Sequence, residues 1–191
     1  MISAKDVSAV IVTRGDVDLA PILKTLPYDE VIVYDNSKSA TDYKCHGRFV
    51  GALAARNDVV YFQDDDLIFT AHDKLLAAYE PGKIVANMPS PWYEREHYDE
   101  MRCVLVGAGS LMPRALVKPC FDRYLAAWPM DDLFLTYCDV VVGILAPGKR
   151  VDLGYEILPH ATAPDRINLQ PGQLERKREM QRRALEIRNA G

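Results

Sequence analysis

Three apolar segments rich in β-branched residues alternate with helix-like segments in the first half of the chain, and this alternation limits the fold more than any other feature. The predicted strands are VSAVIVT (7–13), EVIVYD (30–35) and VVYFQ (59–63). The predicted helices that follow them are 18–26, 47–57 and 71–80. Strands joined by helices of this length form parallel sheets with right-handed crossovers. We therefore expect an α/β fold with a mainly parallel central sheet flanked by helices.

The second half of the chain is less regular. It contains two further predicted strands, 83–88 and 102–114, on either side of a polar, aromatic-rich loop at 89–100. The predicted helices here are 114–127, 131–146 and a charged C-terminal helix at 173–189. At 191 residues, without a repeat or a linker, the chain is expected to fold as one domain.

The composition excludes several classes of protein. The formal net charge of −4 gives no global attraction to nucleic acid or to anionic membranes. The four cysteines, at positions 45, 103, 120 and 138, contain no C-x-x-C pair, which favours reduced thiols in an intracellular protein. The apolar run near the N-terminus is too short for a secretory signal or a membrane span. We therefore expect a cytoplasmic location.

Polar clusters stand at the carboxyl ends of the three predicted strands, at 13–16 (TRGD), 35–37 (DNS) and 64–66 (DDD). Open parallel sheets bind ligands at this edge. Two aspartate carboxylates about 4 Å apart repel by roughly 4 kcal/mol at an effective dielectric constant near 20. Asp64 and Asp66 point the same way in an extended segment, and their oxygens suit Mg²⁺ or Mn²⁺. The alternative is a solvated acidic turn that caps the next helix.

Several short motifs carry a resemblance to a known family. The QDDD that ends the third strand, together with YDNS at the end of the second, resembles the D-x-D nucleotide-sugar site of glycosyltransferases with the GT-A fold, either family 2-like or exostosin-like. Three later motifs are similar to the family's nucleotide-contacting helix end, its acceptor-side strand and the acidic pair of its reaction centre. They are AARND (54–58), VLVGAGSLM (104–112) and DDLFLTYC (131–138). The absence of G-x-G-x-x-G after the first strand argues against a dinucleotide site.

The resemblance implies a GT-A-type single domain over residues 1–170, followed by a charged C-terminal helix at 171–191. Within that domain, residues 1–66 would form the nucleotide-binding half and 67–170 the acceptor half. The implied activity is metal-dependent transfer of a sugar from a nucleoside diphosphate sugar, most commonly a UDP-sugar in this family, to an acceptor hydroxyl. The implied cofactor is Mn²⁺ or Mg²⁺, which bridges the diphosphate of the donor.

The acceptor stays open after this resemblance. A glycan, a lipid-linked sugar, a protein side chain and a modified DNA base are all compatible with it. The chain is short for the fold, so a second subunit of a homo-oligomer could complete the acceptor site.

The resemblance also distributes the candidate site residues among four roles. The metal ligands would be Asp64, Asp66 and His160. The nucleotide-sugar site would comprise Thr13, Arg14, Asp35, Arg56, Asp64, Asp65 and Arg166. The catalytic candidates are Asp132 and Asp131. The acceptor side would comprise Trp92, Gly107, Gly109 and Trp128.

Several of these residues also have a purely structural interpretation. Asp35 can accept hydrogen bonds from a base or a ribose, or it can form an Asx-turn with the residues that follow it. Asp131 and Asp132 can address the acceptor hydroxyl or cap a helix. A large aromatic residue such as Trp128 belongs more often to a core than to a sugar site. The basic C-terminal helix fits a solvated helix with i,i+4 ion pairs better than a guide for an anionic acceptor such as DNA.

Two alternatives to a glycosyltransferase remain. A nucleotidyltransferase that makes a nucleotide sugar shares much of this sheet, but such enzymes carry a Gly-rich loop with a basic residue after the first strand. The segment TRGDVDLAP (13–21) has one glycine and does not supply that loop. The second alternative is a non-catalytic domain with a structural acidic turn, which metal-dependent release of nucleoside diphosphate would exclude.

Overall fold

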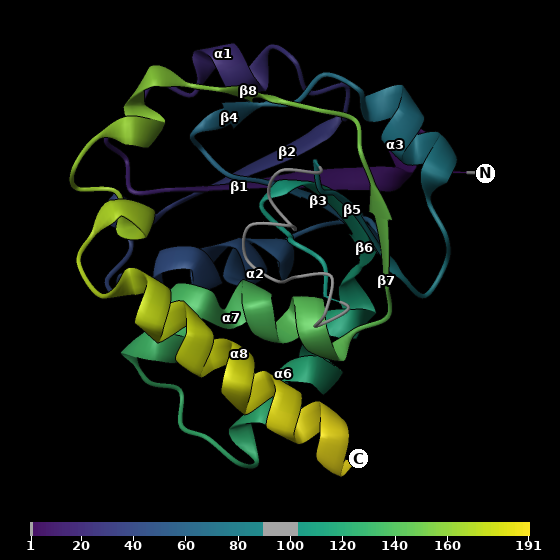
Figure 1. The fold of residues 1–191 in the computed structure, drawn as a ribbon. Helices are drawn as coiled ribbons and strands as arrows, with labels where there is room; N and C mark the ends of the chain where they lie inside the picture. Colours follow the sequence, from purple (N-terminus) through teal and green to yellow (C-terminus); the bar gives the residue numbers. More distant parts are fainter. Residues whose placement is uncertain (1, 90–102) are drawn as a thin grey trace.

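The computed structural model describes residues 2–89 and 103–191, and these form an α/β fold (Figure 1). The main sheet of the described residues has six strands in the order β2-β1-β3-β6-β5-β7. Their bounds are β1 (Val7–Thr13), β2 (Glu30–Asp35), β3 (Val59–Gln63), β5 (Ile84–Asn87), β6 (Ala108–Pro113) and β7 (Gly148–Val151). Strand β6 runs antiparallel to both of its neighbours, and the other pairs are parallel. The predicted mainly parallel sheet is therefore confirmed.

Helices cover both faces of this sheet (Figure 1). One face carries α2 (Gly47–Ala52), α6 (Val117–Leu125), α7 (Asp132–Leu145) and α8 (Gln173–Ala190). The other face carries α1 (Ala20–Leu23), α3 (His72–Ala78) and a small sheet of β4 (Leu67–Ile68) and β8 (Glu156–Ile157). Short 3-10 helices, η1 to η6, occupy the connections at Ala4–Asp6, Asn36–Lys38, Lys44–His46, Arg114–Leu116, Pro159–Thr162 and Ile167–Leu169.

Successive residues of the central strands enter two different cores. Val10 of β1 and Phe62 of β3 belong to the core beneath α2 and α7, whereas Ala9 and Tyr61 belong to the core beneath α3. All four side chains are fully buried. A strand covered on both faces is apolar at nearly every position, so its end is marked by the first polar residues. For this reason the bounds predicted for β1 and β3 agree with those in the structure.

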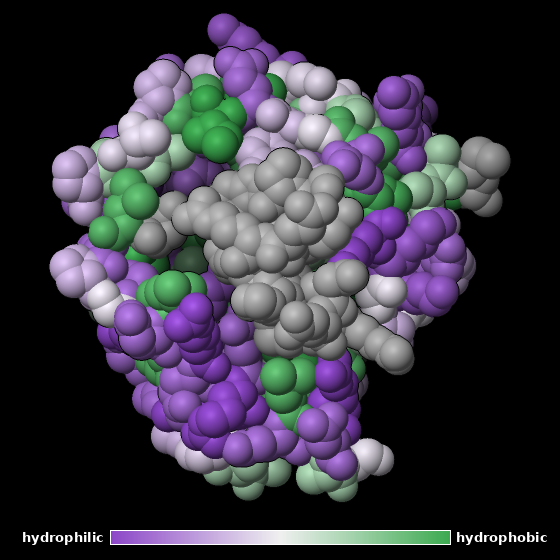
Figure 2. Space-filling view, viewed as in Figure 1, coloured by the Kyte–Doolittle hydropathy of each residue, from purple (hydrophilic) through white to green (hydrophobic). Residues whose placement is uncertain are grey.

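Helix α8 is part of the same core as the sheet. Met180 and Ala184 are fully buried in it. The outer surface of α8 is mostly hydrophilic (Figure 2), and there Arg182 forms an ion pair with Glu186 at i,i+4 spacing. The ion pairs predicted for a solvated C-terminal helix are therefore confirmed.

The predicted elements deviate most at helix ends and in short strands. Helices α1 and α2 are shorter than the predicted 18–26 and 47–57, because the chain turns early to enter β2 and β3. The sequence does not predict β4, and it predicts one short strand in the loop-rich segment 148–172, where the structure has two, β7 and β8; all three strands are two to four residues long. Among the residues described, no helix is both long enough and apolar enough to cross a membrane.

Candidate active site

The carboxyl ends of β1, β2 and β3 meet at one edge of the sheet, and the polar clusters that follow these strands meet there. Gly15, in the loop after β1, has a φ of 81°, a conformation that favours glycine. A Cβ at Gly15 would lie 2.7 Å from Asp35 Oδ1, so the loop after β1 rests directly on the end of β2. Thr13 is buried at the end of β1, and its Oγ1 accepts a hydrogen bond from the Gly15 N–H at 3.1 Å.

Asp35 takes up local hydrogen bonds at this edge. Its Oδ1 accepts from the backbone N–H of Ser37 at 3.0 Å and from the Ser37 hydroxyl at 2.7 Å. Lys38 lies 2.9 Å from its other oxygen. These contacts with Ser37 and Lys38 lower the pKa of Asp35, so the side chain is an ionised acceptor. The Asx-turn is present, and it holds the carboxylate at the edge of the sheet where β1, β2 and β3 end.

Asp64 forms an ion pair that the sequence analysis missed. Its Oδ1 lies 2.6 Å from Nη2 of Arg48, which comes from α2 and is only 3% exposed. On its other side Asp64 packs against Gly107, where an added Cβ would lie 2.1 Å from Asp64 Oδ2. The Asp64 N–H donates to the Gly107 carbonyl at 2.7 Å. Gly107, which was expected on the acceptor side, therefore allows the Asp64 carboxylate to approach the backbone closely.

Asp65 and Asp66 are held in a region that disfavours their charge. Burial raises the pKa of Asp65, with Asp64 adding to the effect while the Thr13 hydroxyl and Arg166 oppose it. Burial, together with the neighbouring carboxylates of Asp64 and Asp65, raises the pKa of Asp66 to about 6. The three aspartates are therefore a cluster whose negative charge the protein balances only in part.

A segment that we call the strap (residues 156–166) crosses this cluster. It begins at β8, which pairs with β4 immediately after the aspartates. The Leu158 N–H donates to the Asp66 carbonyl at 2.8 Å, and His160 Nε2 lies 2.8 Å from the Asp65 carbonyl. Arg166, 7% exposed, donates from Nε to the His160 carbonyl at 3.2 Å. The strap thus brings His160 and Arg166 to the aspartates.

Ion pairs join the strap to the loop after β1. Arg14 donates from Nη2 to Asp165 at 2.7 Å and also pairs with Asp16. The two guanidinium nitrogens of Arg166 lie 3.8 Å from Asp16 and 3.8 Å from Asp65. Two of the three arginines that the sequence analysis assigns to the nucleotide-sugar site, Arg14 and Arg166, therefore lie at this edge, where carboxylates pair with them.

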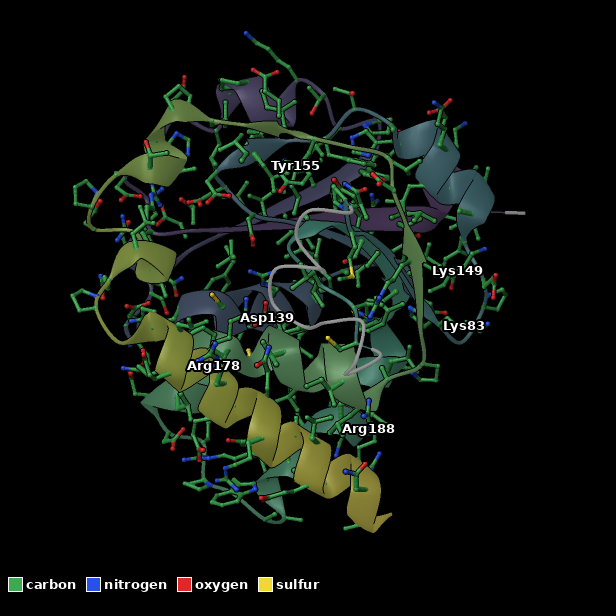
Figure 3. All side chains as sticks on the ribbon, in the orientation of Figure 1. Lys83, Asp139, Lys149, Tyr155, Arg178 and Arg188 are labelled. Atoms are coloured by element: carbon green, nitrogen blue, oxygen red, sulfur yellow. The ribbon has the colours of Figure 1, made fainter. Side chains whose placement is uncertain are left out.

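Tyr155, just before the strap, is a further residue near the aspartates that the sequence analysis missed. Burial raises the pKa of its phenol to about 12, and the negative charges of Asp66 and Asp64 contribute. Figure 3 shows Tyr155 close to the small sheet of β4 and β8. An aromatic ring at this position can pack against a sugar or hydrogen-bond to it.

The acidic pair at the start of α7 is tied to other residues. Asp131 caps the helix by accepting from the Phe134 N–H at 2.9 Å, and it lies 3.3 Å from Arg183. Asp132 pairs with Lys44 and lies 2.5 Å from Arg176 of α8. Hydrogen bonds from Arg176 and Lys44 lower the pKa of Asp132. The helix-capping role is therefore observed for Asp131.

The remaining candidate residues are not brought to the aspartates. Arg56 pairs with Glu30 at the start of β2, which is the opposite edge of the sheet from the ends of the strands. Trp128 packs beneath the Arg183 guanidinium of α8, 4.5 Å from its ring centroid. Gly109, with a φ of 93°, accompanies a bulge in the β3–β6 pairing. Trp92 lies outside the described residues.

The donor set at this edge fits one class of metal site. Within residues 2–89 and 103–191, no group of three or more His, Cys, Asp or Glu side chains forms a ready-made metal site. Mg²⁺ and related ions, however, are commonly held by one or two carboxylates together with substrate phosphates. Asp66, buried beside two other carboxylates and with a raised pKa, has the chemistry of such a ligand. The residues present therefore fit a divalent ion that binds together with a diphosphate.

Comparisons with known proteins bear on the fold. No protein-family model and no curated protein sequence matches the chain. The catalytic domain of Drosophila β1,4-galactosyltransferase 7, in complex with xylobiose, matches with a TM-score of 0.53 at 17% identity, over 91% of this chain and 79% of that chain. The 4-diphosphocytidyl-2C-methyl-D-erythritol synthase of Anaerococcus prevotii matches with a TM-score of 0.50 at 16% identity, over 94% of this chain and 100% of that chain.

The mannosyltransferase PcManGT from Pyrobaculum calidifontis, in complex with GDP-Man and Mn²⁺, has a TM-score of 0.48 at 15% identity over 77% of this chain. The present chain spans 55% of the length of that protein. The architecture and the two preceding structures establish the fold class: the chain has the GT-A-type fold of nucleotide-diphospho-sugar transferases.

Proposed function

We propose that the protein is a metal-dependent glycosyltransferase that moves a sugar from a nucleoside diphosphate sugar to an acceptor hydroxyl. The observation that carries the proposal is the cluster of Asp64, Asp65 and Asp66 at the ligand-binding edge of a GT-A-type sheet, beneath a strap that brings His160 and Arg166 to it. Three adjacent carboxylates with partly uncompensated charge are costly for the fold alone. A site that receives a cation and a diphosphate accounts for them.

Asp66 and the Oδ2 oxygen of Asp64 are the groups that would hold the divalent ion, Mn²⁺ or Mg²⁺, with His160 as a third ligand. When bound, such an ion neutralises negative charge on the departing diphosphate. Arg166 supplies a buried guanidinium to the same diphosphate, because it lies within 3.8 Å of Asp65 and is fixed by the His160 carbonyl.

The nucleoside would lie over the ends of β1 and β2. Asp35, ionised and fixed by Ser37, is an acceptor for base or ribose hydroxyl groups. Thr13 and Arg14 border the same place, and Arg14 would exchange its contacts with Asp165 and Asp16 for contacts with the donor. We take the donor to be a UDP-sugar.

Thermal stability with a panel of nucleoside diphosphates, with and without Mn²⁺, tests this proposal. A ligand at 100 times its dissociation constant adds about 2.7 kcal/mol, which for a chain of this size raises Tm by roughly 5–10 °C. We expect stabilisation by UDP that requires Mn²⁺, is lost in Asp66→Ala and is kept in Asp29→Ala, an exposed matched control. If none of the nucleotides stabilises the protein with Mn²⁺ present, the aspartates are a structural turn.

A nucleotidyltransferase is the second candidate, because the synthase from Anaerococcus prevotii shares the fold over its whole length. The two activities release different products. A glycosyltransferase releases nucleoside diphosphate from a nucleotide sugar, whereas a nucleotidyltransferase releases pyrophosphate from a nucleoside triphosphate. Product analysis with both substrates separates the two.

A further inference from the structure

Helix α7 is fixed against the segment that leads into β6 by direct backbone contact. A Cβ at Gly143 would lie 2.1 Å from the Val104 carbonyl oxygen, so only glycine fits there. The Val104 N–H donates to the Gly143 carbonyl at 3.1 Å. That carbonyl is available because Pro147, four residues later, has no N–H to donate to it. This contact therefore fixes the position of α7 relative to the segment that leads into β6 and to the aspartates at the end of β3.

Asp139 lies one helical turn before Gly143, on the same side of α7. The segment that Gly143 contacts continues to Gly107, against which Asp64 packs. The charged groups that act on Asp139 come from three other elements: Arg48 of α2, Asp64 at the end of β3 and Lys177 of α8. Figure 3 shows Asp139 between α7 and the sheet. Helix α7 thus adds a fourth carboxylate to the acidic edge.

Asp139 differs from the acidic pair at the start of the same helix. Asp131 and Asp132 are each held by cations, Arg183 in one case and Lys44 with Arg176 in the other. The half-buried Asp139 carboxylate forms no ion pair with any residue in the described part of the chain. It is therefore the carboxylate of α7 that is left to act on a bound molecule.

Arg48 supplies an independent sign that this region receives a ligand. Its side chain is only 3% exposed, and its Nη2 is paired with Asp64. Its other terminal nitrogen, Nη1, is buried and has no hydrogen-bond partner among the residues described. A buried guanidinium N–H without a partner is costly, and buried polar groups of this kind are normally satisfied. An oxygen-rich ligand between Asp64 and Asp139 would satisfy it.

We propose that Asp139 is the carboxylate that accepts the proton of the acceptor hydroxyl, an inference that rests on the proposed glycosyltransferase activity. In this step the acceptor oxygen forms a bond to the anomeric carbon of the donor sugar. The bond from that carbon to the diphosphate breaks, and its electron pair leaves with the nucleoside diphosphate. The hydroxyl proton passes to Asp139 and then to water. Burial raises the pKa of Asp139, which makes it a better proton acceptor than a solvated aspartate.

The experiment compares Asp139→Asn with the matched variant Asp122→Asn, an exposed aspartate on α6 that pairs with Lys118, in the full chain. The rate of nucleoside diphosphate release from UDP-sugars with Mn²⁺ is measured, together with the Tm increase caused by UDP and Mn²⁺. We expect Asp139→Asn to lower kcat by about 10²–10⁴-fold with the Tm increase unchanged, and Asp122→Asn to leave both unchanged. Formate should restore part of the lost rate in Asp139→Ala, which a purely structural role would not explain.

Two results would overturn the inference while leaving the proposed function intact. One is a wild-type protein that binds UDP with Mn²⁺ and turns over, together with an Asp139→Asn variant that keeps its kcat. The other is a product that retains the anomeric configuration of the donor, because direct displacement inverts it. A wild-type protein that neither binds nor turns over any nucleoside diphosphate sugar would instead remove the proposed function, and this inference with it.

Discussion

Asp66→Asn should stabilise the ligand-free protein, because the native fold holds this carboxylate where its charge is disfavoured. Burial and the adjacent carboxylates of Asp64 and Asp65 raise the pKa of Asp66 from 3.8 to about 6. The folded protein therefore binds this proton more tightly than the unfolded chain does. Its stability falls as the pH rises from about 4 to about 6, and the full penalty applies above pH 6.

The size of this penalty follows from the pKa difference. Two pH units correspond to about 3 kcal/mol, and partial access to solvent reduces this to about 1–2 kcal/mol. Asparagine has nearly the same shape and no charge, so Asp66→Asn should recover that amount at pH 7.5. For a chain of this size the gain corresponds to a Tm increase of roughly 3–6 °C.

The assay is thermal or urea unfolding of the metal-free protein at pH 7.5 and at pH 4. The control is Asp29→Asn, which removes one charge at an exposed position. We expect Asp66→Asn to be more stable than both wild type and control at pH 7.5, with the difference largely gone at pH 4. The same variant should lose the stabilisation that UDP and Mn²⁺ give to wild type. An Asp66→Asn variant that is no more stable than Asp29→Asn at pH 7.5 would refute the reasoning.

Three further substitutions test other parts of the structure. His72 is buried and its pKa is lowered to about 4, so the neutral form is favoured and stability should fall by about 3 kcal/mol as the pH drops from about 6.5 to about 4; urea titrations across this range should show that loss in wild type and not in His72→Phe. Gly143→Ala should cost about 1–3 kcal/mol in urea unfolding, because its Cβ would meet the Val104 carbonyl at 2.1 Å. Gly107→Ala should leave the protein folded by circular dichroism but abolish UDP and Mn²⁺ binding in thermal shift assays, because its Cβ displaces the Asp64 carboxylate.

The sequence predicts the position of the acidic edge well, because runs of apolar residues mark the buried strands. β1, β2 and β3 begin and end at the predicted residues. Parallel strands bring their carboxyl ends to one edge, so the order of strands and helices is enough to bring Asp35 and Asp64 together. The strap is harder to place, because its position depends on a two-residue pairing of β4 with β8 that leaves no periodic signal.

Arg48 and Asp139 escape the sequence analysis although each carries a readable signal. Arg48 is the one charged residue among the first nine residues of the predicted helix 47–57, and Asp139 is the one charged residue of α7 after its first residue, Asp132. A charge in an apolar helix is rarely buried unless it has a partner. Arg48 pairs with Asp64 at the end of β3, and both of these charges act on Asp139 of α7. Because α2, β3 and α7 are far apart in the chain, only the folded structure brings these three charges near one another.

Arg56 and Trp128 show the reverse case. The family resemblance assigns them to the site, but the fold places Arg56 beside Glu30 and Trp128 beneath Arg183. The AARND motif precedes β3, so Arg56 stands at the amino end of that strand while the aspartates stand at its carboxyl end. A five-residue strand spans about 17 Å, which is beyond the reach of one side chain. The pairing of Arg56 with Glu30 then gives it a structural role.

If the proposed function holds, the charges at the acidic edge predict that the cation and the diphosphate bind there together. Asp64, Asp65, Asp66 and Asp139 bring four carboxylates, and the guanidinium groups nearest to them are Arg48 and Arg166. A diphosphate alone would add negative charge to a site that is already negative. A divalent ion alone would meet carboxylates but lack the phosphate oxygens that such ions commonly take as ligands. Each ligand therefore removes the electrostatic cost of the other, and binding of nucleoside diphosphate should depend steeply on the metal.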